Sequence, residues 1–532
     1  MATRTAIDGP AADGTPGDTD HRRLVLIMGA LMLGMTLAGL DQTVVSTALP
    51  TIAGDLHGLN HLAWVVTAYL LTSTISTPLW GKLGDLYGRK GLFQSAIVIF
   101  LIGSALSGLS RSMFELIAFR AVQGIGAGGL MVGAQAIMGD LISPRERSRY
   151  TGYFTSVFAI TSVVGPLLGG VFTQHLSWRW IFYINLPLGA MALFAVASVL
   201  HLPRSRMRHS IDYLGTALLG AGVSGVILLT TWGGTTYPWG SSAIVILGLV
   251  SAALVVAFLW VETKAVEPII PPALFRIGAF SVTNGIGFLV GFVMFGTIVF
   301  IPLYLQTVHG SSPTSSGLQL LPLVVGLLMT MNLAGQLVSR WGRYKIFPII
   351  GTAMTAVGLL LLSFLTPTTT LFVSSIYMFV IGLGLGLVMG LLVVVAQNSV
   401  PYNQLGVATS TSTFSRSIGS SFGVAIFGAI FNNRLFSELP KYLPSKALAS
   451  ISNHSVSINP AQLDALPAAT RHGYIEAFSH SLQFVFLIAA PFALVAFALT
   501  WLLKEVPLRK DAFVSVNAGE DGGEPWILSG EI

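Results

Sequence analysis

Long apolar runs separated by short polar breaks set the pattern of this sequence. A helix of about 20 apolar residues, rising ~1.5 Å per residue, crosses the hydrocarbon core of a bilayer, so each run predicts one span. We expect fourteen spans, at residues 24–49, 62–80, 92–109, 114–139, 151–173, 180–200, 212–232, 242–262, 280–306, 317–338, 346–365, 370–397, 405–430 and 482–503. The pattern therefore predicts an all-α membrane protein.

Lysine and arginine are distributed unevenly between the two sides of these spans. Most of them lie in one alternate set of short loops and tails, whereas the opposite short loops carry only Arg111 and Arg179. Positively charged loops stay in the cytoplasm, and an even number of spans puts both termini on one side. We therefore expect both termini in the cytoplasm. The net charge of +6 needs no nucleic-acid partner, because this arrangement accounts for most basic residues.

A short motif in the first half of the chain recurs in the second half. Gly81, Leu83, Asp85, Gly88 and Arg89 are matched in order by Gly335, Leu337, Ser339, Gly342 and Arg343, and the same offset aligns Gly165 with Gly419. Two matches at one offset indicate homologous halves. We expect a disordered cytoplasmic tail at 1–23, a six-helix bundle at 24–200, two inserted membrane helices at 201–275, a second six-helix bundle at 276–504 that includes an extracellular loop at 431–481, and a cytoplasmic tail at 505–532.

Composition agrees with a membrane protein and excludes several kinds of chemistry. Of the 532 residues, 53% are hydrophobic and 9% are charged, whereas soluble domains are roughly a quarter charged. The mean hydropathy is +0.76. The absence of cysteine excludes disulfides, thiolate metal sites and cysteine nucleophiles. The histidines show no HExxH pattern, so we expect no metal and no organic cofactor, and nothing points to an enzyme.

Two charged residues lie deep inside predicted spans of the first half. A carboxylate at bilayer depth costs about 2.5–3.5 kcal/mol on insertion scales, so Asp41 is expected to face a cavity or to pair with a cation. Arg120 is predicted at a similar depth in the fourth span. The two could form a buried pair that opens when Asp41 is protonated. The alternatives are a structural hydrogen bond for Asp41 and backbone contacts for Arg120.

Glycine-rich motifs mark a turn and a close helix contact. Gly81, Asp85, Gly88 and Arg89 belong to a tight polar turn between the second and third spans. Gly165, Pro166 and Gly169 give the fifth span a small-residue face with a proline that favours a kink. The GxGxxG at 124–129 lies inside an apolar span with no preceding strand, which argues against nucleotide binding.

Further polar or amphipathic side chains inside spans are candidates to line a central cavity. Taken singly, each is more commonly a hydrogen bond between packed helices. The candidates are Tyr69, Gln123, Asn284, Tyr304, Gln306, Gln397, Asn398 and Arg416. Arg416 is the only cation placed deep in the second half, where it either faces the cavity or reaches toward the cytoplasm.

These motifs together resemble one family over nearly the whole chain. The turn at 81–90, the helix containing Asp41, the string Arg120–Gln123–Gly124, the pair Gly165–Pro166, the string 178–187 and the string 302–306 carry the resemblance. They are similar to fourteen-span drug:proton antiporters of the major facilitator superfamily, in the QacA/EmrB-like branch. The string 178–187, WRWIFYINLP, is especially characteristic of that branch.

The resemblance implies a fold of two pseudo-symmetric six-helix bundles with two extra central helices. It implies a multi-pass transporter of a bacterial cell membrane that works as a monomer and exports hydrophobic or cationic compounds against protons. Asp41 and Arg120 would couple the proton, whereas Asp85, Arg89 and the glycine-proline motif would belong to the moving gate. Thr161 replaces a glycine of the fuller motif, and the last six spans lack deep acids, which puts dication export in doubt. The alternative is a dedicated exporter of an endogenous metabolite, natural product or lipid.

Overall fold

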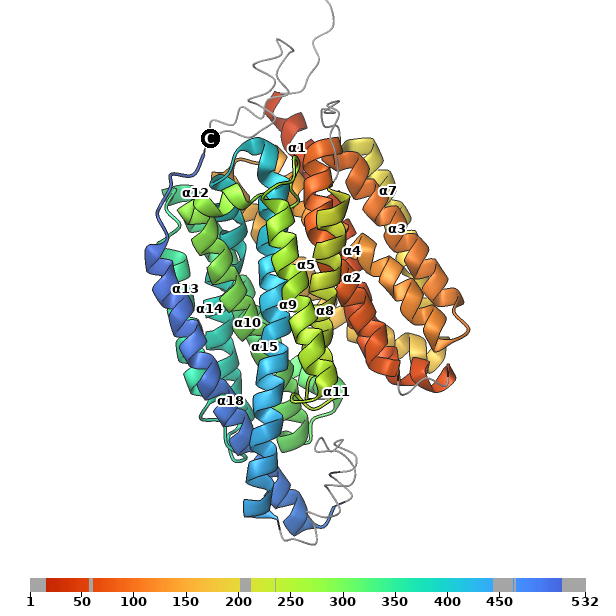
Figure 1. Cartoon of the computed structure of the whole chain (residues 1–532), viewed down its shortest axis with the longest axis vertical. Helices are drawn as coiled ribbons and strands as arrows, with labels where there is room; N and C mark the ends of the chain where they lie inside the picture. The colour runs from red at the N-terminus through yellow and green to blue at the C-terminus, as the bar shows by residue number, and fades with distance from the viewer. Residues whose placement is uncertain are drawn as a thin grey trace, which may run out of the picture.

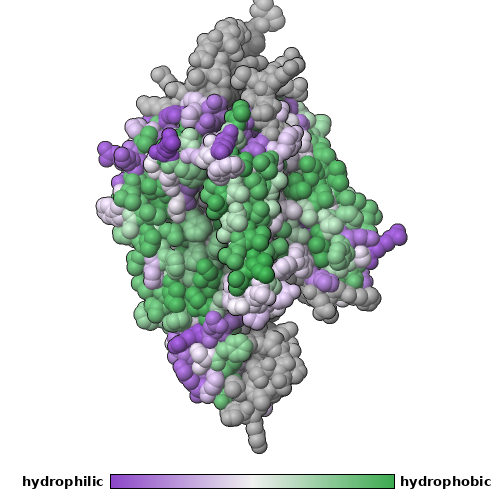
Figure 2. Space-filling view, viewed as in Figure 1, coloured by the Kyte–Doolittle hydropathy of each residue, from purple (hydrophilic) through white to green (hydrophobic). Residues whose placement is uncertain are grey.

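The computed structural model describes residues 16–56, 61–200, 212–234, 236–443, 463 and 466–509. Within these residues the chain is helical, and its β-structure is one isolated bridge between Gly233 and Tyr237. The long helices run side by side along the longest axis of the molecule (Figure 1). On the face shown in Figure 2 an apolar band covers the helices, and polar residues gather above and below it.

The first half contains six long helical segments, the last of them broken after one turn. They are α1 (Pro16–Asp55), α2 (Leu62–Tyr87), α3 (Arg89–Leu109), α4 (Met113–Leu141), α5 (Pro144–His175) and the consecutive pair α6 (Trp180–Tyr183) and α7 (Asn185–Val199). The hairpin of α8 (Tyr213–Trp232) and α9 (Ser242–Glu262) follows. It packs beside α2 and α15, so it lies between the two halves.

The second half repeats this arrangement. It contains α10 (Gly278–His309), the consecutive pair α11 (Pro313–Gln319) and α12 (Leu321–Trp341), then α13 (Ile346–Leu362), α14 (Leu371–Asn398), α15 (Leu405–Tyr442) and α18 (Ala468–Leu502). The 3-10 turns η2 (Pro272–Arg276) and η3 (Tyr402–Gln404) precede α10 and α15. The contacts α1 with α5 and α2 with α4 are matched by α10 with α15 and α12 with α14, so corresponding helices pack alike in both halves.

Every predicted span falls on one of these helices. By length and composition, eleven helices among the described residues can cross a membrane, and Ile346–Leu362 is apolar but shorter. The count of fourteen spans and the cytoplasmic position of the termini stay predictions.

Two predicted boundaries differ from the structure. The helix α1 begins at Pro16, inside the predicted disordered tail. The predicted loop 431–481 is helical at both ends, through Tyr442 and from Ala468. Glu438 pairs with Arg434 at i,i+4 and Lys441 at i,i+3, which supports a polar helix there. The tail predicted at 505–532 lies largely outside the described residues.

Glycines allow the helices of each half to approach closely. A Cβ at Gly126 of α4 would lie 2.5 Å from a backbone nitrogen of α3, and one at Gly382 of α14 would lie 2.1 Å from a carbonyl oxygen of α12. Such contacts hold helices together where lipid removes the hydrophobic drive between them. The same packing fixes the polar side chains described below.

The two ends of the helix bundle differ in charge. At one end of the bundle α2 meets α3, α4 meets α5, and α12 meets α13, and we call this end the basic end. The residues at and beside these junctions include Arg89, Lys90, Arg145, Arg147, Arg149, Arg340, Arg343 and Lys345. Both α1 and the segment after α18 lie at this end (Figure 1).

Candidate functional site

Asp41 of α1 and Arg120 of α4 form an ion pair inside the first half. Their side chains are 2.5 Å apart, from Oδ2 to Nη1, and each residue is 1% exposed. Gln123 lies one turn after Arg120; its Nε2 donates to Asp41 Oδ1 at 2.8 Å, and its Oε1 accepts from Arg120 at 2.8 Å. The sequence placed these groups at similar depth, and the structure brings all three into one network.

Aromatic and amide groups complete this network. The guanidinium of Arg120 lies 4.2 Å from the ring centroid of Tyr69, which favours the cation electrostatically. Asn185 donates to Asp41 Oδ1 at 3.2 Å and to Ser104 Oγ at 3.0 Å. Sequence reasoning quoted Asn185 only as part of a family motif. Its amide inside a predicted span was the signal that could have marked it as a site residue.

Asp85 joins the two halves at the basic end. Its carboxylate accepts the backbone N–H groups of Gly406 at 2.9 Å and Val407 at 2.8 Å, in the first turn of α15. Unpaired N–H groups make a helix N-terminus attractive to an anion. Arg89 donates to Asp85 at 2.6 Å and pairs with Asp140 at 2.7 Å. Sequence reasoning missed Asp140, although it follows directly on a predicted span.

Two glycines of the turn explain its shape. Gly88 has φ +93°, a conformation that favours glycine, and it separates α2 from α3. A Cβ at Gly81 would lie 2.2 Å from Ser410 Oγ and 2.5 Å from the Gly406 carbonyl oxygen. The first half therefore contacts α15 backbone to backbone at this end.

Arginines of α5 make a second junction between the halves at the basic end. The buried Arg147 donates to Gln397 Oε1 and to the carbonyl oxygens of Gly139 and Ile142. Arg145 donates to the carbonyl oxygens of Ser339 and Arg340, each at 2.7 Å. The second copy of the turn motif, which has Ser339 in place of Asp85, thus meets α5 through backbone carbonyls. Arg147 was predicted only as a cytoplasmic charge.

The glycine-proline motif of α5 lies against α1. A Cβ at Gly165 would lie 2.0 Å from Thr43 Oγ1, and the Thr43 hydroxyl donates to the carbonyl oxygen of Thr161 at 2.9 Å. Pro166 lies within α5, and its side chain is outside the described residues. Gly169 is buried one turn further along. This contact between α5 and α1 lies close to Asp41 along α1.

Several predicted cavity residues lie elsewhere. Tyr304 donates to the carbonyl oxygen of Thr366, and Gln306 donates to Ser316, so both tie loops at the end opposite the basic end. Asn398 donates to the carbonyl oxygen of Pro507 and accepts from the Arg509 N–H. These three lie near helix ends, and the structure does not bring them together with Asp41.

The remaining candidates take different positions. Gln397 belongs to the Arg147 junction, where its Nε2 donates to Thr409 Oγ1. Asn284 bonds the carbonyl oxygen of Phe280 and the hydroxyl of Ser415, which is a contact between α10 and α15. Arg416 is partly exposed in α15.

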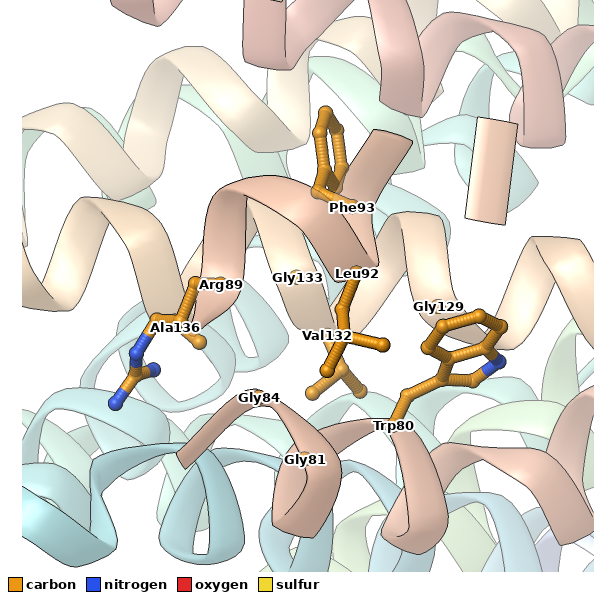
Figure 3. A pocket seen from close by; sticks show the side chains of 10 residues that line it. All are labelled: Trp80, Gly81, Gly84, Arg89, Leu92, Phe93, Gly129, Val132, Gly133 and Ala136. Carbon is orange, nitrogen blue, oxygen red and sulfur yellow. The ribbon is translucent and has the colours of Figure 1, made fainter. Parts of the chain in front are cut away.

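A small recess beside Arg89 is too small to be the substrate site. α2, α3 and α4 line it, with Arg89 at one edge and Trp80 at the other (Figure 3). Its volume of about 10 Å³ is that of one water molecule. In the part of the chain that the structure describes, no three His, Asp or Glu side chains gather closely enough to hold a metal ion.

Comparison with known proteins identifies the family. The model of the Major Facilitator Superfamily matches residues 31–213 and 209–424, which is most of the chain. The chain belongs to this superfamily. It is 41% identical to the multidrug transporter protein MdtP of Bacillus subtilis, over 80% of this chain and 79% of that protein. It is 36% identical to multidrug resistance protein 3 of the same organism, over 89% and 94%.

A solved structure agrees on the fold. The proton:xylose symporter XylE shares 14% identity and superposes with a TM-score of 0.60, over 93% of this chain and 99% of that one. Membership of the superfamily makes the protein a multi-pass membrane transporter for small molecules and not an enzyme. Its relatives include proteins named as multidrug transporters.

Proposed function

We propose that this transporter exports hydrophobic compounds from the cytoplasm or inner leaflet in exchange for protons. It would work as a monomer in the cell membrane of a bacterium, with both termini in the cytoplasm and fourteen spans. The observation that carries the proposal is the buried pair of Asp41 and Arg120. A carboxylate held at bilayer depth by one cation is suited to gain and lose a proton, since conformational change alters its surroundings.

The proposed coupling step follows from the hydrogen bonds of Asp41. A proton added to its Oδ2 removes the charge that Arg120 pairs with. Arg120 then keeps Gln123 and the carbonyl oxygen of Val65, at 3.5 Å, as acceptors. Protonation therefore weakens the tie between α1 and α4. Release of the proton on the cytoplasmic side would restore it and reset the transporter.

The proposed gate is the set of contacts between the halves at the basic end. In this structure Asp85 binds α15, Arg147 binds Gln397, and Arg145 binds the end of α12. These contacts hold that end closed. Alternating access requires them to break when the transporter opens to the cytoplasm, so substrate loading and gate opening would be linked.

The test is uncoupler-sensitive efflux from energised cells. A panel of one cationic, one neutral and one anionic fluorescent lipophilic dye is loaded into cells that make the native protein, Asp41→Asn or Asp55→Asn. Asp55 ends the same helix and is exposed, bonding the indole of Trp178, so it is the matched control. We expect Asp41→Asn to abolish efflux at equal expression and Asp55→Asn to retain it.

The opposite results would separate the parts of the proposal. Uncoupler-insensitive efflux by the native protein would refute proton coupling. Normal efflux by Asp41→Asn would refute the role of Asp41. If the native protein moves none of the dyes, export of general hydrophobic compounds is refuted, and a dedicated substrate replaces it.

A further inference from the structure

Arg416 of α15 is a cation at membrane depth that lacks a partner among the residues that the structure describes. It lies eleven residues after Leu405, the first residue of the helix, so it is ~16 Å from the basic end at ~1.5 Å per residue. Among the described residues no carboxylate or hydrogen-bond acceptor interacts with its guanidinium. By contrast, Arg120 pairs with Asp41, and Arg147 bonds three acceptors.

Arg416 is not completely buried. The residue is partly exposed, and none of its nitrogens is both buried and unbonded. Gly291 of α10 makes room for its aliphatic stem, since a Cβ there would lie 3.0 Å from Arg416 Cγ. An unpaired charge at this depth is costly, and such residues in transporters mark the path of a substrate or ion.

Hydroxyl groups without partners lie next to this cation. Ser412 and Thr413 precede Arg416 by four and three residues, which puts them on the same helix face. Their buried Oγ atoms have no hydrogen-bond partner among the described residues. Other hydroxyls of this helix do bond a carbonyl of the preceding turn, as Thr409 and Ser420 show. Two free donors beside a free guanidinium make a site that fits an anionic oxygen group.

The helices of the second half place no acid at the depth of Arg416 in the part of the chain that the structure describes. Asp85 of α2 bonds the first turn of α15, and Glu476 of α18 lies near the opposite end of the bundle. No Asp or Glu occurs in α10, α12, α13 or α14. Glu438 is the acid of α15, and it follows Arg416 by 22 residues, or ~33 Å. Asp41 is already bound by Arg120. The second half therefore presents a net positive charge at mid-depth, which attracts anions and repels cations.

We propose that Arg416, with Ser412 and Thr413, binds the carboxylate of amphipathic organic acids, and that this site selects such acids among the exported compounds. This inference rests on the proposed export function for its physiological meaning. The binding step itself needs no gradient. It can therefore be tested on the purified protein, apart from transport.

The test compares an acid with its uncharged ester. The probes are 4-(1-pyrenyl)butyric acid and its methyl ester, titrated at neutral pH into the purified full-length protein and followed by energy transfer from tryptophan. Charge-assisted hydrogen bonds predict that the acid binds about tenfold or more tightly than the ester. Arg416→Gln should bring the acid to the affinity of the ester and leave the ester unchanged. Arg416→Lys should give an intermediate value.

Control variants keep the result specific. Arg434→Gln removes another arginine of α15, one that pairs with Glu438, and should not change either affinity. The double change Ser412→Ala with Thr413→Ala should weaken the acid severalfold and spare the ester. Equal binding of acid and ester by the native protein would overturn the proposal, and so would an equal loss of both in Arg416→Gln. Efflux without proton coupling would refute the proposed function alone.

Discussion

Removing one member of the buried pair Asp41 and Arg120 should destabilise the protein far more than removing one member of an ion pair at a helix end. Both residues are 1% exposed, so removal of one leaves the other charge buried and unpaired. Breaking such a pair costs about 3–5 kcal/mol. We expect Asp41→Asn and Arg120→Gln each to lower the free energy of unfolding by this amount.

A double-mutant cycle isolates the interaction itself. The variant with both changes carries no buried charge, so it should lose less than the sum of the single losses, with a coupling energy of about 2–3 kcal/mol. Arg434 and Glu438 form the control pair, because the Arg434 side chain is 39% exposed. Their coupling should stay below about 1 kcal/mol.

The assay is unfolding of the purified protein by SDS in mixed micelles, followed by circular dichroism. The experiment is informative only if all variants start with native helical content. If the cycle for Asp41 and Arg120 gave a coupling as small as that for Arg434 and Glu438, the buried pair would have no special energetic role. The account of proton coupling through this pair would then be refuted as well.

Two further predictions concern the gate and the contact of α5 with α1. Asp85→Asn removes the anion from the N-terminus of α15 and should weaken the contact between Asp85 and α15 by about 1–2 kcal/mol. The chain has no cysteine, so the rate at which an impermeant maleimide labels Ser410→Cys from the basic end reports opening of the gate. Asp85→Asn should increase this labelling rate severalfold. An unchanged rate would contradict the proposed gate. Gly165→Ala should reduce efflux, since its Cβ would clash with Thr43 Oγ1 and would lie 2.7 Å from Thr43 Cβ. Thr43→Gly removes both atoms and should restore part of the efflux. A double variant as impaired as Gly165→Ala would argue against this clash.

Hydrophobicity predicted where helices lie better than which faces they use. Apolar runs located every long helix, because a span must be apolar over a fixed length. The pattern of apolar runs did not predict the polar ends of the helices. Helix α15 continues to Tyr442 through charged residues that pair along its own surface.

The candidate site was predictable to the extent that depth determines it. Asp41 and Arg120 could be matched because each lies a few turns inside a span. Tyr304 and Asn398 lie close to helix ends, where they bond loop carbonyls. Arg147 was predicted only as one of the cytoplasmic charges. A count of charges does not show that the Arg147 side chain is buried and bonds Gln397.

The two copies of the turn motif bind the opposite half by different chemistry. Asp85 holds the first turn of α15 with a carboxylate, a group that can take up a proton. Arg145 holds backbone carbonyls at the end of α12, and neither member of that contact titrates in proteins. Acidification at this end therefore weakens one contact and leaves the other intact. Acidification would therefore loosen the Asp85 side of the gate first, and the Arg145 contact would break after it.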